Sequence, residues 1–219
     1  MNARGIPVVL AAPSGTGKTT LSHGLVDGST GYVFSTSATT RPPRQGETDG
    51  VDYHFVSAED FERRIAVGDF VEWAEVHGRL YGTPRGEIEA AVRRGENLVL
   101  DIDVQGARQL RESVPEAKLI FVLPPSLGIM MGRLIGRGTE SPADVARRLQ
   151  SALLELQAAP DFDYLVINDN LDECLGTIRS IVENGEDTNA SLKQDAEQLK
   201  AEIARLLIDE YADYVNVTG

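Results

Sequence analysis

The feature that most constrains the fold of this chain is a glycine-rich run directly after an apolar stretch near the N-terminus. The apolar stretch is Ile6 to Ala11, and the run comprises Ala12, Pro13, Ser14, Gly15, Thr16, Gly17, Lys18 and Thr19. Glycines lack Cβ, so the chain can fold tightly and turn several backbone N–H groups toward one point. A helix that begins near Lys18 adds its positive end there. This order of strand, loop and helix is typical of a loop that holds a nucleoside triphosphate.

The last two residues of the run have separate expected roles. Lys18 should reach the β and γ phosphates, and the Thr19 hydroxyl is placed to ligate a Mg²⁺ ion that comes with ATP. The pattern usually begins with glycine, and Ala12 takes that place here. Because alanine is also small, we predict that residues 12–19 bind ATP.

Composition narrows the class of partner. The chain has 219 residues, of which 42% are hydrophobic, enough to bury one full core. Its formal net charge of -13 argues against nucleic acid or an anionic membrane surface as a partner, because both would be repelled. The only cysteine, Cys174, excludes an intrachain disulfide and favours a cytoplasmic location. No stretch approaches the roughly 18 apolar residues that span a bilayer, so we expect no membrane association.

Apolar runs alternate with helical patterns along most of the chain, which is typical of a mostly parallel sheet covered by helices. We therefore expect an α/β fold. The expected strands are residues 6–11, 32–34, 98–102, 119–123 and 164–167, and helices are expected to start near Lys18, Val104, Ser126, Pro142 and Leu171. Ser141 and Asp144 mark the start of the helix at Pro142 as a capping pair.

The segment from about residue 35 to residue 95 breaks this rhythm and indicates an inserted lobe. It contains short extended pieces at 51–56, 70–76 and 79–83, a turn at His77-Gly78, a helix over 58–67 capped by Ser57 and Asp60, and a second helix after Thr83-Pro84. A small mixed α/β lobe of this kind is suited to holding a second substrate.

Polar residues of this lobe indicate what that substrate is. Arg41 and Arg44, with Tyr53 nearby, suit a doubly charged phosphate, because each guanidinium can bind two oxygens at once. Glu72 is a carboxylate between apolar neighbours. A guanine ring offers two adjacent N–H donors to one carboxylate, whereas adenine has an acceptor in place of one of them. Glu72 is therefore a sensible candidate for the residue that recognises guanine.

Two further groups fit phosphoryl transfer. Asp101 ends an apolar run, so its carboxylate should emerge at the sheet edge near the phosphate loop and serve as a partner of Mg²⁺. A glycine-containing segment that could bend and close is flanked by Arg133, Arg137, Arg147 and Arg148, and arginines on such a segment suit the charge on a moving phosphoryl group. For Arg147 a solvated helix face is the favoured alternative. For Asp101 and also for Asp103, capping of the following helix is the alternative role.

Taken together, these residues resemble the guanylate kinase family, whose members phosphorylate GMP with ATP. The resemblance covers about residues 5 to 183. It includes residues 12–19 and 37–44, Gly50-Val51-Asp52-Tyr53, Glu72-Trp73, Tyr81-Gly82-Thr83, residues 100–106, Gly136-Arg137-Gly138-Thr139 and Asn168-Asp169.

The resemblance implies a P-loop NTPase-type parallel sheet with flanking helices, a GMP-binding lobe and a mobile lid. It implies that Arg41, Arg44, Tyr53 and Tyr81 bind the GMP phosphate, that Ser37, Glu72, Thr83 and Asp103 face the guanine, and that Arg133, Arg137 and Arg148 reach the phosphates. On this basis a guanylate-kinase-like domain spans 1–185, with the core at 1–34, 96–125 and 151–185, the lobe at 35–95 and the lid at 126–150.

Residues 186–219 follow as an acidic tail with an apolar stripe at helical spacing. The stripe must be buried against the core, a second copy of the chain or another partner. We expect a homo-oligomer contact through this helix.

Two other functions remain open at this point. One is a related kinase of a phosphorylated sugar such as ribose bisphosphate, which shares the loop but has no purine to recognise. The other is a non-catalytic guanylate-kinase-like interaction module. Lys18 and the lid arginines argue against the module, and Ser37, Glu72 and Thr83 argue against the sugar.

Overall fold

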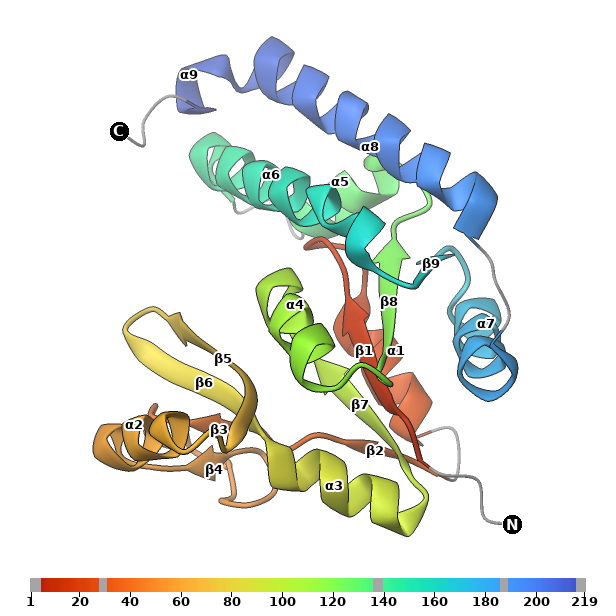
Figure 1. Cartoon of the computed structure of the whole chain (residues 1–219). Coiled ribbons are helices and arrows are strands. Elements are labelled where there is room, and N and C mark those ends of the chain that lie inside the picture. The colour runs from red at the N-terminus through yellow and green to blue at the C-terminus, as the bar shows by residue number, and fades with distance from the viewer. Residues whose placement is uncertain (1–4, 28–30, 136–139, 186–188, 216–219) are drawn as a thin grey trace. The chain divides into compact units, whose positions relative to one another are not determined.

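The computed structural model describes residues 5–27, 31–135, 140–185 and 189–215. The chain divides into two compact units. Figure 1 labels their helices and strands. Residues up to Val9 and Leu25–Lys118 form the first unit, and Leu10–Gly24 and the chain from Leu119 onward form the second. Each unit contains one group of the residues that the sequence singles out.

The main sheet has five strands in the order β2-β7-β1-β8-β9, and the division between the units falls within β1. Its strands are β1 (Pro7–Ala11), β2 (Tyr32–Phe34), β7 (Asn97–Asp101), β8 (Lys118–Leu123) and β9 (Tyr164–Ile167). β2 pairs with β7 and β8 pairs with β9, both in parallel. Every residue of β1 is buried. The predicted α/β fold and its five strands are thus confirmed to within one residue at each end.

Helices of each unit cover the strands of that unit. In the first unit α3 (Arg85–Arg94) packs on β7, and α4 (Val104–Ser113) follows that strand. In the second unit α7 (Leu171–Asn184) packs on β9. The remaining helices of the second unit are α1 (Lys18–Asp27), which begins there, α5 (Leu127–Ile135), α6 (Pro142–Gln157), η1 (Ala159–Asp161), α8 (Asn189–Glu210) and α9 (Ala212–Val215). Ser141 caps α6 as predicted, because its Oγ accepts a hydrogen bond from the Asp144 N–H at 3.2 Å.

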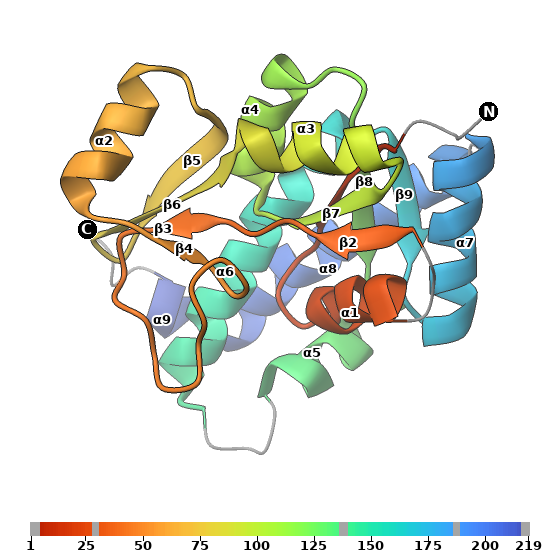
Figure 2. The same cartoon turned by 90° about the horizontal axis from the view of Figure 1, so that it is seen from below.

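The inserted lobe of the first unit is a smaller sheet in the order β4-β3-β6-β5. Its elements are β3 (Ala38–Thr39), β4 (His54–Phe55), α2 (Ala58–Ala66), β5 (Phe70–Val76) and β6 (Arg79–Pro84). Figure 2 shows α2 beside the β5–β6 hairpin, where the rings of Phe61 and Phe70 stack with centroids 4.3 Å apart. His77 and Gly78 form the turn, both with positive φ. The lobe is therefore held by a small core of its own.

One predicted strand of the lobe is wrong in extent. The sequence predicts extended chain over 51–56, but the strand β4 covers only His54 and Phe55, and Tyr53 forms an isolated bridge with Asp49. The N–H groups of Val51 and Asp52 instead donate to the Thr48 carbonyl, at 3.2 and 3.0 Å. These local bonds turn the chain before it can join the sheet.

The tail forms the predicted helix, α8. Four of its apolar residues at helical spacing, Ala196, Leu199, Ile203 and Leu207, are buried. α8 packs on α6 and β9 of its own unit (Figure 1). Burial against the chain itself, one of the alternatives that the sequence left open, therefore accounts for this stripe, and a subunit contact through the helix stays a prediction. None of the described helices is both long and apolar enough to cross a membrane.

Candidate active site

The phosphate loop between β1 and α1 is held in shape by side chains from the second unit. Thr16 is fully buried, and its carbonyl accepts hydrogen bonds from Asn168 Nδ2 at 2.7 Å and from Arg133 Nη1 at 3.1 Å. Gly15 and Gly17 have φ of 85° and 91°, a region that favours glycine. A Cβ on Gly17 would lie 2.8 Å from Asn168 Nδ2. The glycines of the motif are therefore required by both conformation and space.

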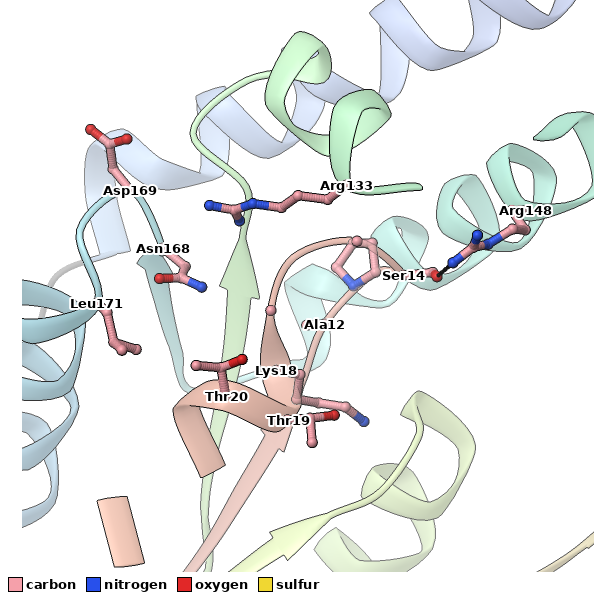
Figure 3. A pocket seen from close by; sticks show the side chains of 13 residues that line it. Ala12, Ser14, Lys18, Thr19, Thr20, Arg133, Arg148, Asn168, Asp169 and Leu171 are labelled. Carbon is pink, nitrogen blue, oxygen red and sulfur yellow. Dashed lines mark hydrogen bonds between the residues drawn. The ribbon is translucent and has the colours of Figure 1, made fainter. Parts of the chain in front are cut away.

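A pocket of about 590 Å³ opens over this loop (Figure 3). It is lined by Ala12, Pro13, Ser14, Gly15, Gly17, Lys18, Thr19, Thr20, Arg133, Arg148, Asn168, Asp169 and Leu171. The predicted ATP-binding residues thus face one cavity, except Thr16, which lies buried beneath it. Figure 3 shows Arg133 reaching across the loop from α5, while Arg148 approaches Ser14 from α6.

Helix α6 contacts the loop through two side chains. Arg148 donates to Ser14 Oγ at 3.3 Å and to the Leu134 carbonyl at 2.5 Å, and lies 3.8 Å from a carboxylate oxygen of Glu140. Two turns further on, Glu155 Oε2 accepts the Ser14 N–H at 3.3 Å. The position of α6 therefore sets where the Arg148 charge lies relative to the loop.

The chemistry of this pocket suits a polyphosphate. Positive charge from Lys18, Arg133 and Arg148 converges on it, together with the N-terminal end of α1. Arg137, the fourth predicted cation, lies outside the described residues. The supporting contacts of Asn168 and Glu155 were not predicted from the sequence. The sequence points to Asn168 only as part of the Asn168-Asp169 pair, and no local sequence pattern identifies Glu155 as a partner of the loop.

The first unit holds the second group of predicted residues around a buried carboxylate. Glu72 of β5 is 7% exposed and pairs across the hairpin with Thr83 of β6, which is fully buried. The Thr83 hydroxyl donates to Glu72 Oε1 at 2.6 Å. Burial raises the pKa of Glu72, and the charge of Asp103 adds to this, while the Thr83 hydrogen bond opposes it. One carboxylate oxygen is thus fixed by Thr83.

Asp103 lies close enough to Glu72 to influence it, and it also caps α4. Its Oδ1 accepts the Gly106 N–H at 2.8 Å, so the capping role is confirmed. Its side chain is exposed. Ser37 is half-buried, and its carbonyl accepts the His54 N–H at 2.9 Å.

The predicted phosphate-binding residues form a cluster around Arg41. Its guanidinium lies 5.3 Å from the ring centre of Tyr53, whose ring meets that of Tyr81 edge-on at 6.1 Å. Arg44 is exposed. Arg41 Nη1 and Nη2 bind Glu47 Oε2 and Oε1 at 2.9 and 2.8 Å.

Glu47 is a member of this cluster that was not predicted from the sequence. Besides Arg41, it accepts the Arg44 N–H at 2.6 Å, and these hydrogen bonds lower the pKa of Glu47 to about 2. The hydrogen bond with Glu47 raises the pKa of Arg41 above its usual value, and one with Tyr81 adds to this. No local pattern in the sequence identifies Glu47 as the partner of Arg41, because the turn that brings them together forms only in the fold.

Comparison with known proteins decides the family. The guanylate kinase family model matches residues 4–185. The chain belongs to the guanylate kinase family. The guanylate kinase of Symbiobacterium thermophilum is 47% identical over 179 residues, covering 82% of this chain and 85% of that protein. The guanylate kinase of Synechocystis sp. is 44% identical, covering 83% and 95%. The crystal structure of guanylate kinase from Anaplasma phagocytophilum is 30% identical, with a TM-score of 0.64 over 95% of this chain and 96% of that one.

Membership of the guanylate kinase family confirms the resemblance in the sequence and makes the chain an enzyme with a P-loop NTPase fold. The family model ends where α7 ends, so α8 and α9 lie beyond it. The division into core, lobe and lid, and the role of each site residue, stay predictions.

The predicted metal ligands are Thr19, at the start of α1 in the second unit, and Asp101, at the end of β7 in the first. Thr19 lines the loop pocket, and Asp101 is exposed. In the part of the chain that the structure describes, no group of three or more His, Cys, Asp or Glu side chains could hold a metal. A single hydroxyl ligand such as that of Thr19 fits Mg²⁺ bound mainly by phosphate oxygens and water, because Mg²⁺ keeps several waters and takes few protein ligands.

Proposed function

We propose that the chain transfers the γ-phosphoryl group of ATP to GMP or dGMP, giving ADP and GDP or dGDP, in purine nucleotide metabolism and GMP recycling. The observation that carries the guanine preference is the buried carboxylate of Glu72, oriented by Thr83 at 2.6 Å. A desolvated carboxylate needs donors, and guanine supplies two adjacent N–H groups. Adenine presents an acceptor at one of these places and would leave the carboxylate facing a lone pair.

The reaction needs little covalent work from the protein. An anionic phosphate oxygen of GMP attacks the γ-phosphorus of ATP in line, the bond to the β-γ bridging oxygen breaks, and ADP leaves with that electron pair. No general base is required, because the attacking oxygen already carries charge. Lys18, Arg133, Arg137 and Arg148 stabilise the charge that spreads over the transferred group. Mg²⁺, held by Thr19 and Asp101, would neutralise charge on the phosphates when ATP is bound.

The cluster around Arg41 would hold the phosphate of GMP. Arg41, Arg44, Tyr53 and Tyr81 supply the donors, and Glu47 orients the Arg41 guanidinium before the ligand arrives. The guanine then lies toward Ser37, Glu72, Thr83 and Asp103. Binding both ends of GMP supplies the positioning on which phosphoryl transfer depends.

Several finer statements belong to this proposal. We infer that ATP and GMP are the ligands, that Mg²⁺ is the required ion, and that nucleic acid is not a partner, as the charge of -13 favours. A cytoplasmic location and a homo-oligomer also stay predictions. Removing Mg²⁺ with a chelator should abolish turnover, and adding it back should restore it.

The test measures ADP release from ATP and Mg²⁺ with GMP, dGMP, AMP, UMP or ribose bisphosphate as the acceptor. We expect turnover with GMP and dGMP only, and a fall of about 100-fold in kcat/KM for GMP in Glu72→Gln, since a buried charged hydrogen-bond partner is lost. Glu75→Gln, on the exposed part of the same strand, is the matched control. Turnover of the sugar alone would move the function to that class of kinase, and no turnover at all would indicate a binding module.

A further inference from the structure

One side chain of α4 pairs with the strand that carries Glu72. Gln109 Oε1 accepts the N–H of Trp73 at 3.1 Å, and Gln109 Nε2 donates to the carbonyl of Trp73 at 3.0 Å. Strand β5 is at the edge of its sheet, so these two backbone groups have no neighbouring strand. The glutamine amide takes the place that the backbone of such a strand would occupy.

The same face of α4 lies against Glu72 itself. Gly106 is one turn before Gln109, and a Cβ there would lie 2.9 Å from Glu72 Oε2. Asp103 is one turn earlier still and caps the helix. Three residues of α4 or its cap, each three positions after the last, therefore contribute differently to the packing of this helix against β5. Asp103 supplies a carboxylate, Gly106 leaves room for a second one, and Gln109 holds the strand.

This arrangement needs a contact that holds β5 in place, because it brings two negatively charged side chains, Glu72 and Asp103, close together. Glu72 is desolvated and the Asp103 charge acts on it, so the two carboxylates repel each other in the absence of a ligand. Within the sheet, β5 is hydrogen-bonded to β6 on one side only, so the position of its outer edge depends on α4, which packs against it. A pair of hydrogen bonds from α4 to the residue next to Glu72 resists a shift of this edge.

We infer that Gln109 is a positioning residue for guanine recognition, fixing β5 to α4 so that the carboxylates of Glu72 and Asp103 keep one spacing. The inference rests on the proposed function, since it deepens the role of the same site. Gln109 acts through the backbone of Trp73 and needs no contact with the ligand.

The chain provides a reporter for this inference, because Trp73 is its only tryptophan and is 39% exposed. GMP titrations followed by Trp73 emission give a Kd without turnover, and acrylamide quenching reports how firmly β5 is held. The variant Gln109→Met keeps the length of the side chain and removes both hydrogen bonds. Gln109→Glu keeps an acceptor but places a negative charge against the Trp73 carbonyl.

We expect Gln109→Met to raise the Kd and the KM for GMP about fivefold, as two neutral and partly exposed hydrogen bonds are lost. Gln109→Glu should raise both further. In both variants acrylamide quenching of Trp73 increases, while the KM for ATP and the Tm stay near those of the wild type. Gln198→Met, at an exposed glutamine of α8, is the matched control and should change none of these values.

An unchanged Kd for GMP in Gln109→Met, with a wild type that binds GMP, would overturn the inference alone. A parallel loss of ATP affinity and Tm would also overturn it, because the residue would then be merely structural. A wild-type chain that neither binds nor phosphorylates GMP would overturn the proposed function, and this inference with it.

Discussion

Glu72 is the residue at which recognition and stability oppose each other. Burial raises its pKa, so the folded chain binds this proton more tightly than the unfolded chain does. Between the ordinary pKa and the raised one, unfolding releases a proton, and the free energy of unfolding therefore falls as the pH rises. A carboxylate that suits guanine thus lowers stability at neutral pH.

We predict that Glu72→Gln gains stability relative to the wild type as the pH rises from 4.5 to 8. Glutamine keeps an oxygen for the Thr83 hydroxyl, so that hydrogen bond remains. Urea unfolding at both pH values measures the difference, with Glu75→Gln as the exposed control on the same strand. A difference between Glu72→Gln and the wild type that does not grow with pH would contradict the assignment of burial as the dominant cause.

Residues were predictable from the sequence where their own chemistry limits their use. Lys18 at a helix start, Arg41 near a tyrosine and Glu72 among apolar neighbours each point to one ligand group. Glu47 and Gln109 were not predictable, since their functions depend on partners that only the fold supplies. Gln109 meets Trp73 across 36 residues of sequence, and no local pattern marks such a pair.

Among the elements, the phosphate loop depends most directly on glycine. Gly17→Ala would meet Asn168 Nδ2 at 2.8 Å and would hold alanine at a φ of 91°. We predict that the KM for ATP rises at least about tenfold, as expected for about 1.4 kcal/mol or more of strain. ADP-release kinetics at saturating GMP measure it.

Gly176→Ala is the matched control for that prediction. Gly176 is exposed within α7, and a Cβ there would have nothing within 4 Å. The substitution should leave ATP kinetics unchanged and stabilise the chain by about 0.5–1 kcal/mol, the usual gain of alanine over glycine in a helix. Equal kinetics for the two variants would show that the loop tolerates a side chain at residue 17.

Strands and helices were predictable where a long run or repeat of apolar residues is buried. The strands of the main sheet read as continuous apolar runs because parallel strands are covered on both faces. β3 has two residues and β4 has two, too few to carry a period, and both depend on pairing with strands elsewhere in the lobe. The turn around Thr48 was missed because its hydrogen bonds outweigh the β propensity of Val51.

At the scale of the whole molecule, the composition of the tail, residues 186–219, does not determine which surface covers its apolar stripe. An acidic amphipathic helix can cover its own chain or a second copy, and the stripe alone does not distinguish them. The fold distinguishes the two, because α8 packs on α6 and β9, and α9 contacts both α6 and α8. Gln150 of α6 also donates to the Val215 carbonyl at 3.3 Å. Residues beyond the family match are therefore part of the second unit's core.

We predict that Ile203→Ala lowers the free energy of unfolding by about 2–5 kcal/mol, since its side chain is fully buried and leaves a cavity. Ile208→Ala, on the same helix but 71% exposed, should stay within about 0.5 kcal/mol of the wild type. Light scattering should give the same mass for both variants and the wild type, because the side chain of Ile203 is buried within its own unit. A change of mass in Ile203→Ala without loss of stability would instead mean that this face of α8 joins two chains.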